Sequence, residues 1–428
     1  MHFCIKTNAF NFIGAFVVSV VLRQNLKGEQ IELADDVSIL DFGSGKITVL
    51  IGKRGLNDTI VLSGKAEVEY GGFVNGEFLE PNKLPHAIAA AISSAEQSAR
   101  QTITHLTVGV PGEFTVSVCQ DASLSLGRTR KIVDEDIDEL HEQANSFKTN
   151  KDYTLINDQP IYYTLDDGRR LIQPVGLESS KLGGHISYVL AENHFIDLID
   201  AILKQLDIKS HDYISSLVAT SMYLFEDSMR DRYIVFLDSG RITTNAVVAR
   251  GDGILSQYNI PYGGGHITGA LAMDFKISYA EAESLKQKIA LNLNVSDKDV
   301  YTITTNRSDT KEFNAKRANL VVSGVIKLIA ETITKALKNC TYDYPDYIPY
   351  HLTGGGITYI KGAGDLLSKC LKKPVEIAVP KLPLSNKPHL SSSLGLLDMA
   401  LRLVPEPVSK PKSFFKKIFG SRKKSDKK

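Results

Sequence analysis

Residues 37–51 read VSILDFGSGKITVLI, and this stretch decides the fold because it joins an apolar strand, a glycine turn and a second strand. Residues 233–248, YIVFLDSGRITTNAVV, repeat the same pattern much later in the chain. Each copy is followed by a further turn and strand, ending near Leu62 in the first copy and at Ile260 in the second. This duplication predicts two similarly folded halves that face one another.

The segments between and after the two copies mix helices with strands. Helical periodicity with few breakers predicts helices at residues 84–101, 195–206, 279–289 and 314–338. The segment from about 111 to 182 differs from the rest, because it mixes short strands with an acidic helix near 134–145, which is typical of an inserted α+β subdomain. Its predicted short strands lie at 114–119, 153–156 and 161–164. A third glycine cluster, LTGGG at 352–356, follows a strand and precedes a helix around 364–371.

Composition places the chain among ordinary globular proteins. Of its 428 residues, 43% are apolar and 23% are charged, which excludes collagen-like and disordered classes. The 50 Lys and Arg residues balance 49 Asp and Glu residues, so no nucleic-acid partner is expected. The balance hides an asymmetry, because residues 410–428 hold nine basic residues and one acid, a net charge of +8. The rest of the chain is therefore acidic.

Cysteine usage and the N-terminal segment bear on the compartment. The four cysteines form no CxxC pair, so neither a disulfide framework nor a zinc site is indicated, and a reducing compartment fits. Residues 9–22, AFNFIGAFVVSVVL, are mostly apolar but lack a following small-residue cleavage site. Three interpretations stay open: an extension on the fold or a start placed too far upstream, a short membrane-associated segment, or a secretion signal.

The glycine turns indicate a phosphate ligand. A residue without Cβ lets backbone N–H groups converge on an anion, and a carboxylate at the end of each strand can hold a hydrated Mg²⁺ against phosphates. Any one glycine turn is more often an ordinary hairpin. The combination of several turns with the matching Asp41 and Asp238 predicts a nucleotide site. His266 is interpreted as a helix-entry residue, and Asp134 and Asp136 as the decoration of a helix start.

The C-terminal tail has an amphipathic pattern. With Ser413 as N-cap, a helix places its aromatic and aliphatic residues on one side and its lysines on the other. A helix this short forms mainly when its apolar face enters a lipid interface, and each basic residue near an anionic leaflet adds about 1 kcal/mol. The tail therefore predicts binding to anionic membrane lipids through Phe414, Phe415, Lys416, Lys417, Ile418 and Phe419. The alternative interpretation is a solvated charged tail or a nucleic-acid patch, and the aromatic residues behind the proline-rich linker argue against it.

Residues 41–46, DFGSGK, resemble the first phosphate loop of the actin-like ATPase superfamily, and residues 352–356 resemble its adenosine loop. Within the superfamily the order of motifs resembles the FtsA family of bacterial cell-division proteins. The supporting segments are PVGL at 174–177, IPYGG at 260–264, AESLK at 282–286 and the Phe/Lys-rich C-terminus. The resemblance extends from about residue 36 to the end of the chain.

The resemblance implies an α/β, two-lobed actin-like (ribonuclease H-like) fold with ATP and Mg²⁺ in the cleft, an inserted α+β subdomain and a C-terminal amphipathic membrane-targeting helix. Asp41 and Asp238 would face the metal through water, and Asp238 is the one candidate catalytic residue. The implied nucleotide-binding set is Asp41, Gly43, Ser44, Gly45, Lys46, Asp238, Gly240, Thr243, Gly264, Glu283, Lys286, Gly354, Gly355 and Gly356.

The same resemblance implies a division of the chain into domains. The expected segments are an N-terminal extension of uncertain role at 1–34, a first lobe at 35–111 and 183–230, an inserted FtsA-type subdomain at 112–182, a second lobe at 231–403, a proline-rich linker at 404–412 and the basic tail at 413–428.

The family implies a cell-division role. Its members polymerise at the cytoplasmic face of the cell membrane, anchor the FtsZ ring at the septum and recruit later division proteins. The second phosphate loop departs from the family's Asp-Ile-Gly-Gly-Gly-Thr and following Asp, because this chain has Arg241, Ile242 and Asn245 there. Ile242 would be strained if that position needed a positive φ, and Arg241 could instead add charge toward a phosphate. The departure predicts slow or absent hydrolysis. The alternatives are a degenerate actin-fold scaffold or another actin-like ATPase of the pilus-assembly, chaperone or sugar-kinase type.

Overall fold

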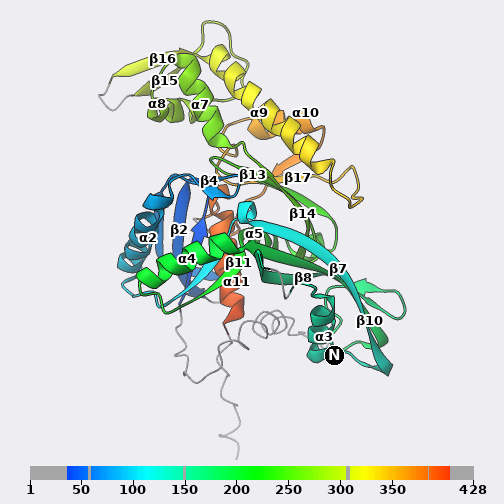
Figure 1. Cartoon of the computed structure of the whole chain (residues 1–428). Helices are drawn as coiled ribbons and strands as arrows, with labels where there is room; N and C mark the ends of the chain where they lie inside the picture. The colour runs from blue at the N-terminus through cyan, green and yellow to red at the C-terminus, as the bar shows by residue number, and fades with distance from the viewer. Residues whose placement is uncertain (1–35, 56–58, 148–150, 305–308, 384, 405–428) are drawn as a thin grey trace, which may run out of the picture.

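The computed structural model describes residues 36–55, 59–147, 151–304, 309–383 and 385–404 (Figure 1). The predicted N-terminal extension, the linker beyond Val404 and the basic tail lie outside the described residues.

The first lobe is built on a five-stranded sheet. β1 (Val37–Phe42), β2 (Lys46–Arg54) and β3 (Ile60–Glu69) form an antiparallel meander. β6 (His105–Val110) pairs with β1 and β11 (Ser210–Ser215) pairs with β6, both in parallel, which gives the order β3-β2-β1-β6-β11. All six residues of β1 are buried, because helices cover both faces of the sheet.

The second lobe repeats this arrangement. β12 (Ile234–Ser239), β13 (Thr244–Arg250) and β14 (Gly253–Ile260) form the meander, and β17 (Tyr350–Thr353) and β18 (Val375–Ile377) continue the sheet in parallel. The order β14-β13-β12-β17-β18 matches that of the first lobe. The structure therefore confirms the predicted duplication.

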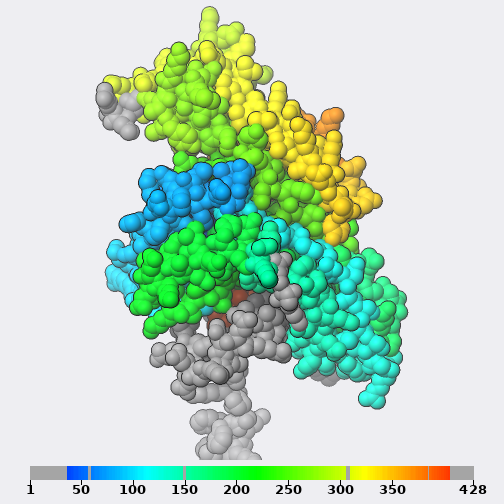
Figure 2. Space-filling view, in the orientation of Figure 1, coloured from blue at the N-terminus to red at the C-terminus, as the bar shows by residue number. Residues whose placement is uncertain are grey.

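A helical layer joins the two sheets. α5 (Ser216–Leu224) and α11 (Ser391–Leu403) contribute to one hydrophobic cluster with Ile39 of the first sheet and Phe236 of the second. α2 (Leu84–Ala99) and α4 (Asn193–Gln205) cover the opposite face of the first sheet, on the left of Figure 1. The two lobes thus share a core, and Figure 2 shows them in contact on the viewed face.

Further helices complete the second lobe. α7 (Gly264–Phe275), α8 (Tyr279–Lys286), α9 (Ala315–Leu337) and α10 (Ala363–Leu371) share one hydrophobic cluster with its sheet, and α7 and α8 lie beside the hairpin of β15 (Val300–Thr304) and β16 (Thr310–Asn314) at the outer end (Figure 1). The predicted helices at 84–101, 195–206, 279–289 and 314–338 correspond to α2, α4, α8 and α9. Asn314 begins α9, because its side chain accepts a hydrogen bond from the Arg317 backbone N–H.

The inserted segment is a four-stranded sheet covered by one helix. It comprises β7 (Thr115–Lys131), α3 (Asp134–Ala144), β8 (Tyr153–Leu165), β9 (Arg170–Leu171) and β10 (Glu178–Glu192), in the order β7-β10-β8-β9. The expectation of short strands was wrong, because the segments predicted at 153–156 and 161–164 are one strand. Pro160 is accommodated at a register shift opposite His185 and Ile186, so the strand continues through it.

Short elements connect these units. They are β4 (Phe73–Val74), β5 (Glu77–Phe78), α6 (Asp227–Arg230) and the 3₁₀ turns at Pro81–Lys83, Gly112–Phe114 and Pro388–Leu390. Within the described ranges, no helix combines the length and the apolar character that crossing a membrane requires.

Candidate functional site

The structure brings Asp41 and Asp238 to one site between the lobes. Each lies near the end of the first strand of its meander, and the turns that follow these two strands meet, because the Ile242 N–H donates to the Ser44 Oγ. Burial and then the nearby charge of Asp41 raise the pKa of Asp238 to about 6. The two carboxyl groups are therefore close enough for the charge of one to affect the pKa of the other.

Asp41 is held by serine hydroxyls. Ser392 and Ser393, in the first turn of α11, donate hydrogen bonds of 2.9 and 2.7 Å to its two carboxylate oxygens, and Ser216 of α5 donates one of 3.4 Å. Burial raises the pKa of Asp41 and these hydroxyls oppose the rise. The arrangement fixes the carboxylate at the N-terminal end of α11, where negative charge is favoured. Sequence reasoning missed these serines, because only the fold brings them to Asp41.

Asp238 has a different environment. Among the described residues it has no side-chain hydrogen-bond partner, and it keeps a part of its surface open to solvent. Asn245 lies directly opposite Asp238 on β13, and the Asn245 Oδ1 is buried with no partner in the described part of the chain. Two carboxylates and a spare amide oxygen are the ligand chemistry that suits a hydrated Mg²⁺. No group of three or more His, Cys, Asp or Glu side chains in the described residues could hold a metal ion.

We expect Asp238→Asn to stabilise the chain at neutral pH. An acid whose pKa is raised in the folded state adds stability only while it is protonated, so its contribution is lost as the pH rises from about 4 through 6. The variant should be more stable than the parent by about 2 kcal/mol above pH 7 and equal to it below pH 4. Urea unfolding followed by circular dichroism at several pH values measures this difference. Asp343→Asn, at an exposed position, is the control, and an equal gain at pH 4 and pH 8 would contradict the expectation.

The two hairpins predicted to bind phosphate touch each other directly. The Ile242 N–H donates a hydrogen bond of 3.1 Å to the Ser44 Oγ. A Cβ added to Gly45 would lie 2.4 Å from the Arg241 Cδ, and one added to Gly240 would lie 2.5 Å from the Ser44 Oγ. Side chains of each hairpin therefore pack against the backbone of the other. Nothing else can lie between the hairpins at these points in this conformation.

Several predicted glycines use their N–H groups inside the protein. Gly240 donates to the Thr243 carbonyl at 2.8 Å, Gly264 to the Gly240 carbonyl at 3.0 Å, and Gly356 to the Ser239 carbonyl at 2.6 Å. A Cβ on Gly264 would lie 2.2 Å from the Gly356 carbonyl oxygen. Three backbone segments thus meet at distances that only glycine permits. Thr243 is buried in the same hairpin.

The other predicted site residues lie either beside the glycine cluster of the second lobe or at the turn of the first hairpin. Lys286 donates to the Gly264 carbonyl at 3.2 Å and pairs with Glu283 at 2.7 Å, so both lie beside the glycine cluster. Lys46 is half exposed and pairs with Glu67 of β3 at 3.3 Å. Gly43 donates to the Lys46 carbonyl within its own turn.

The glycines of the predicted adenosine loop lie beside Asp238 and His389. Gly354 adopts a φ of +84° beside Asp238, where a Cβ would lie 2.4 Å from the Asp238 Oδ1. A Cβ on Gly355 would lie 3.0 Å from the His389 Cβ, and the His389 ring is 2.6 Å from the Tyr359 hydroxyl. His266 lies in the first turn of α7 and accepts a hydrogen bond from the Gly263 N–H, as expected for a helix-entry residue.

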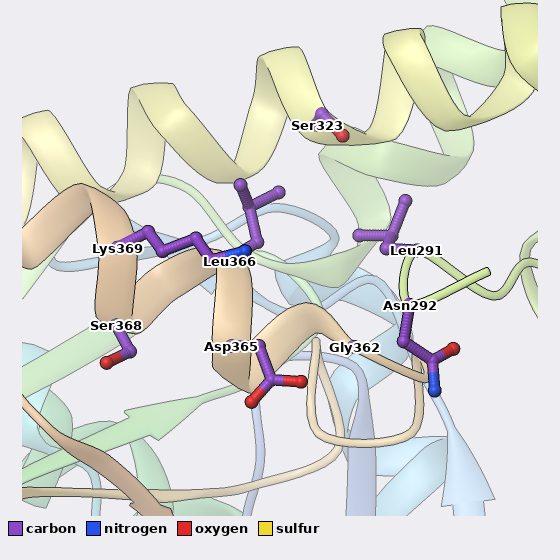
Figure 3. Close-up of a pocket in the computed structure, with 8 residues that line it drawn as sticks. All are labelled: Leu291, Asn292, Ser323, Gly362, Asp365, Leu366, Ser368 and Lys369. Carbon is purple, nitrogen blue, oxygen red and sulfur yellow. The ribbon is translucent and has the colours of Figure 1, made fainter. Parts of the chain in front are cut away.

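The cavity drawn in Figure 3 lies outside this cleft. It has a volume of about 480 Å³ between α9 and α10, with Leu291 and Leu366 directed into it. None of the predicted nucleotide-binding residues lines it. The Asp41 and Asp238 carboxylates and the Asn245 Oδ1 fit a hydrated metal ion better than this cavity does.

Comparisons with known proteins decide the family. The model of "SHS2 domain inserted in FTSA" matches residues 112–190, and the model of "Cell division protein FtsA" matches residues 235–395. The cell-division protein FtsA of Neisseria meningitidis serogroup B is 21% identical over 386 residues, covering 87% of this chain and 92% of the relative. The FtsA of Bacillus subtilis is 21% identical over 369 residues, covering 85% and 83%. The chain belongs to the FtsA family.

A solved structure supports the actin-like fold of this FtsA-family chain. A chain of the PilM-PilN type IV pilus biogenesis complex superposes with a TM-score of 0.57 at 16% identity, covering 86% of this chain and 99% of that one. The predicted two-lobed actin-like fold with an FtsA-type insert is confirmed. The match of the insert model ends at residue 190, near the end of β10, and β10 runs as one continuous strand across the predicted boundary at 182. This chain is therefore an actin-like cell-division protein.

Proposed function

We propose that this FtsA-family chain polymerises with copies of itself at the cytoplasmic face of the cell membrane, at the division septum. There it anchors the FtsZ ring and recruits later division proteins. Membership of the FtsA family supports the proposal, and the FtsA-type insert is the observation that carries it.

The insert is bonded to both lobes. On the first lobe, the Ser215 N–H of β11 donates to the Asn157 Oδ1 of β8 at 2.8 Å. Ser187 of β10 donates to the Ile254 carbonyl at 2.6 Å, and Gln257 of β14 donates to the Thr115 carbonyl at 2.7 Å. Arg250 of the second lobe also stacks on Tyr162 of the insert at 5.5 Å. An insert held by both lobes presents a stable surface, which suits a role in docking other division proteins or the next subunit.

ATP with Mg²⁺ is the ligand proposed for the cleft. Bound nucleotide would supply negative charge between the lobes, neutralised in part by the metal ion. Asp238, with Asn245 beside it, would face the hydrated metal, and Asp41 would orient it from the α11 side. Glu283 and Lys286 would hold the ribose beside Gly264. Asn245 in place of a carboxylate removes a base for water, so hydrolysis should be slow or absent.

The membrane tether is assigned to the tail, residues 413–428. Its three phenylalanines and Ile418 supply apolar area, and its lysines and arginine supply charge toward anionic lipid. The two contributions can be separated experimentally, because the aromatic residues can be replaced while every charge is kept.

Sedimentation with lipid vesicles tests the tether. We expect the full chain to sediment with vesicles containing anionic phospholipid, and a chain lacking residues 411–428 to lose at least tenfold in affinity. A variant with Phe414, Phe415 and Phe419 changed to serine should lose most of the binding although its charge is unchanged. FtsZ added to the mixture should sediment only with vesicles that carry the full chain.

Equal sedimentation of the full and shortened chains would contradict the tether. Retention of FtsZ by vesicles carrying the shortened chain would contradict anchoring through the tail. A second candidate function is a scaffold that keeps the fold without a nucleotide. The departure of Arg241, Ile242 and Asn245 from the family's second phosphate loop favours it.

A further inference from the structure

We propose that Arg241 and Ile242 form an interlobe latch, which holds the two hairpins together without nucleotide and which a nucleotide must displace in order to bind. The seat of the latch is Ser44, Gly45 and Gly72 on the first lobe. The inference rests on the proposed nucleotide site and describes how that site is regulated.

Ile242 fills the space beside the first hairpin. A Cβ on Gly72 would lie 2.7 Å from the Ile242 Cδ1 and 2.3 Å from the Ser44 carbonyl oxygen, so the side chain packs against bare backbone. Gly72 has a φ of +85°, which fixes glycine at this contact. Ile242 does not adopt a positive φ, so the backbone strain considered for it does not arise. The residue fits the latch without backbone cost.

Arg241 closes the other side of the contact. Its methylene groups lie over Gly45, where a Cβ would be 2.4 Å from the Arg241 Cδ, and its guanidinium lies 5.5 Å from the centre of the Tyr279 ring. Its backbone carbonyl accepts a hydrogen bond of 2.6 Å from the Gly265 N–H. In the described part of the chain the guanidinium has no carboxylate partner. The Arg241 side chain is therefore held by Gly45 of the first lobe and by Tyr279 of the second, and its backbone is held by Gly265.

The latch and a phosphate compete for the Ile242 N–H. This N–H could donate to a phosphate oxygen, and here it donates to the Ser44 Oγ at 3.1 Å instead. A phosphate between the hairpins would have to break this bond and move both side chains. The apparent affinity for nucleotide is then low, because only the small fraction of molecules with an open latch can bind it.

The test compares the full chain with the variant R241G/I242G, which gives this turn two glycines. R241A/I242A is the second variant, since it removes the side chains without adding glycine flexibility. Arg100→Gly is the matched control: Arg100 ends α2 at a φ of +59°, where glycine is accommodated, and lies outside the latch. Far-ultraviolet circular dichroism checks that each variant is folded.

Two readouts are measured. Binding of a fluorescent ATP analogue with Mg²⁺ should be at least tenfold tighter in both double variants than in the parent and in Arg100→Gly. Without nucleotide, hydrogen exchange at residues 43–46 and 240–244 should be faster in the double variants, because the hairpins are no longer held together.

The outcomes separate the latch from the proposed site. Faster exchange in the double variants together with tighter nucleotide binding supports both. Faster exchange with no binding in any form supports the latch and overturns the nucleotide site. Unchanged exchange overturns the latch, and so does a parent chain that binds the analogue as tightly as the double variants.

Discussion

Gly356→Ala is expected to destabilise the chain by about 3 kcal/mol, whereas Gly355→Ala in the same loop should cost less than about 1 kcal/mol. A Cβ on Gly356 would lie 2.2 Å from the Gly240 carbonyl oxygen and 2.6 Å from the Ser239 Oγ, so backbone would have to move. A Cβ on Gly355 would meet only the His389 side chain and backbone, at 3.0 Å and beyond. Urea unfolding followed by circular dichroism suits the measurement, because the chain has no tryptophan.

The pair of variants distinguishes two reasons for glycine in this loop. If Gly356 is required for close packing of three backbone segments, stability falls with no nucleotide present. If it is required only for a phosphate or adenine, both variants keep the parent's stability and lose nucleotide binding alone. The second result would contradict the packing explanation.

Arg230→Met is expected to cost about 4 kcal/mol of unfolding free energy, because it removes one partner of a buried ion pair. Arg230 donates to the Asp252 carboxylate at 2.8 Å and to the carbonyls of Phe225 at 2.7 Å and Met222 at 3.2 Å. It lies at the point where the chain passes from the first lobe to the second, beneath the turn between β13 and β14. Asp252 would be left as an uncompensated buried charge.

The loss should depend on pH. Burial raises the pKa of Asp252 and Arg230 opposes that rise, so the pKa of Asp252 climbs further once the arginine is gone. An acid with a raised pKa in the folded state destabilises the fold where it must ionise, and the cost of Arg230→Met should therefore be larger at pH 8 than at pH 5. Adding Asp252→Asn should recover a large part of the loss. Arg232→Met, at an exposed position, is the control and should change stability by less than about 0.5 kcal/mol.

A loss from Arg232→Met equal to that from Arg230→Met would indicate a general effect of removing positive charge, and would contradict the buried-pair explanation. So would a cost of Arg230→Met that is the same at both pH values and unaffected by Asp252→Asn.

The duplicated hairpins could be predicted from sequence, because both the alternation of the strands and the Asp–x–Gly turns are local patterns. Helices with one apolar face, such as α9, could be predicted for the same reason. α5 could not, because SLVATSMYL is buried on nearly all sides and has no amphipathic period. α11 was missed since its first residues, SSSLG, carry the composition of a turn.

The two matching hairpins could be predicted from sequence, but their contacts with each other and with α11 could not. Asp41 and Asp238 could be paired because their hairpins match. The serines that bond Asp41 and the meeting of Ile242 with Ser44 depend on segments that are distant in sequence, and no local pattern encodes such contacts. The departure at Arg241 and Ile242 was visible in the sequence. Its consequence, direct contact between the lobes, could not be predicted, because it depends on how the two hairpins lie in the folded protein.

α11 links the cleft to the last described part of the chain. It is a rod of 13 residues, about 20 Å long, whose first turn bonds Asp41 and whose other end reaches Leu403, next to Val404. Asp398 pairs with both Arg54 and Arg402, which braces the lower half of the rod against β2. A pulling force on the chain beyond Val404 would therefore be transmitted along α11 to the Asp41 carboxylate.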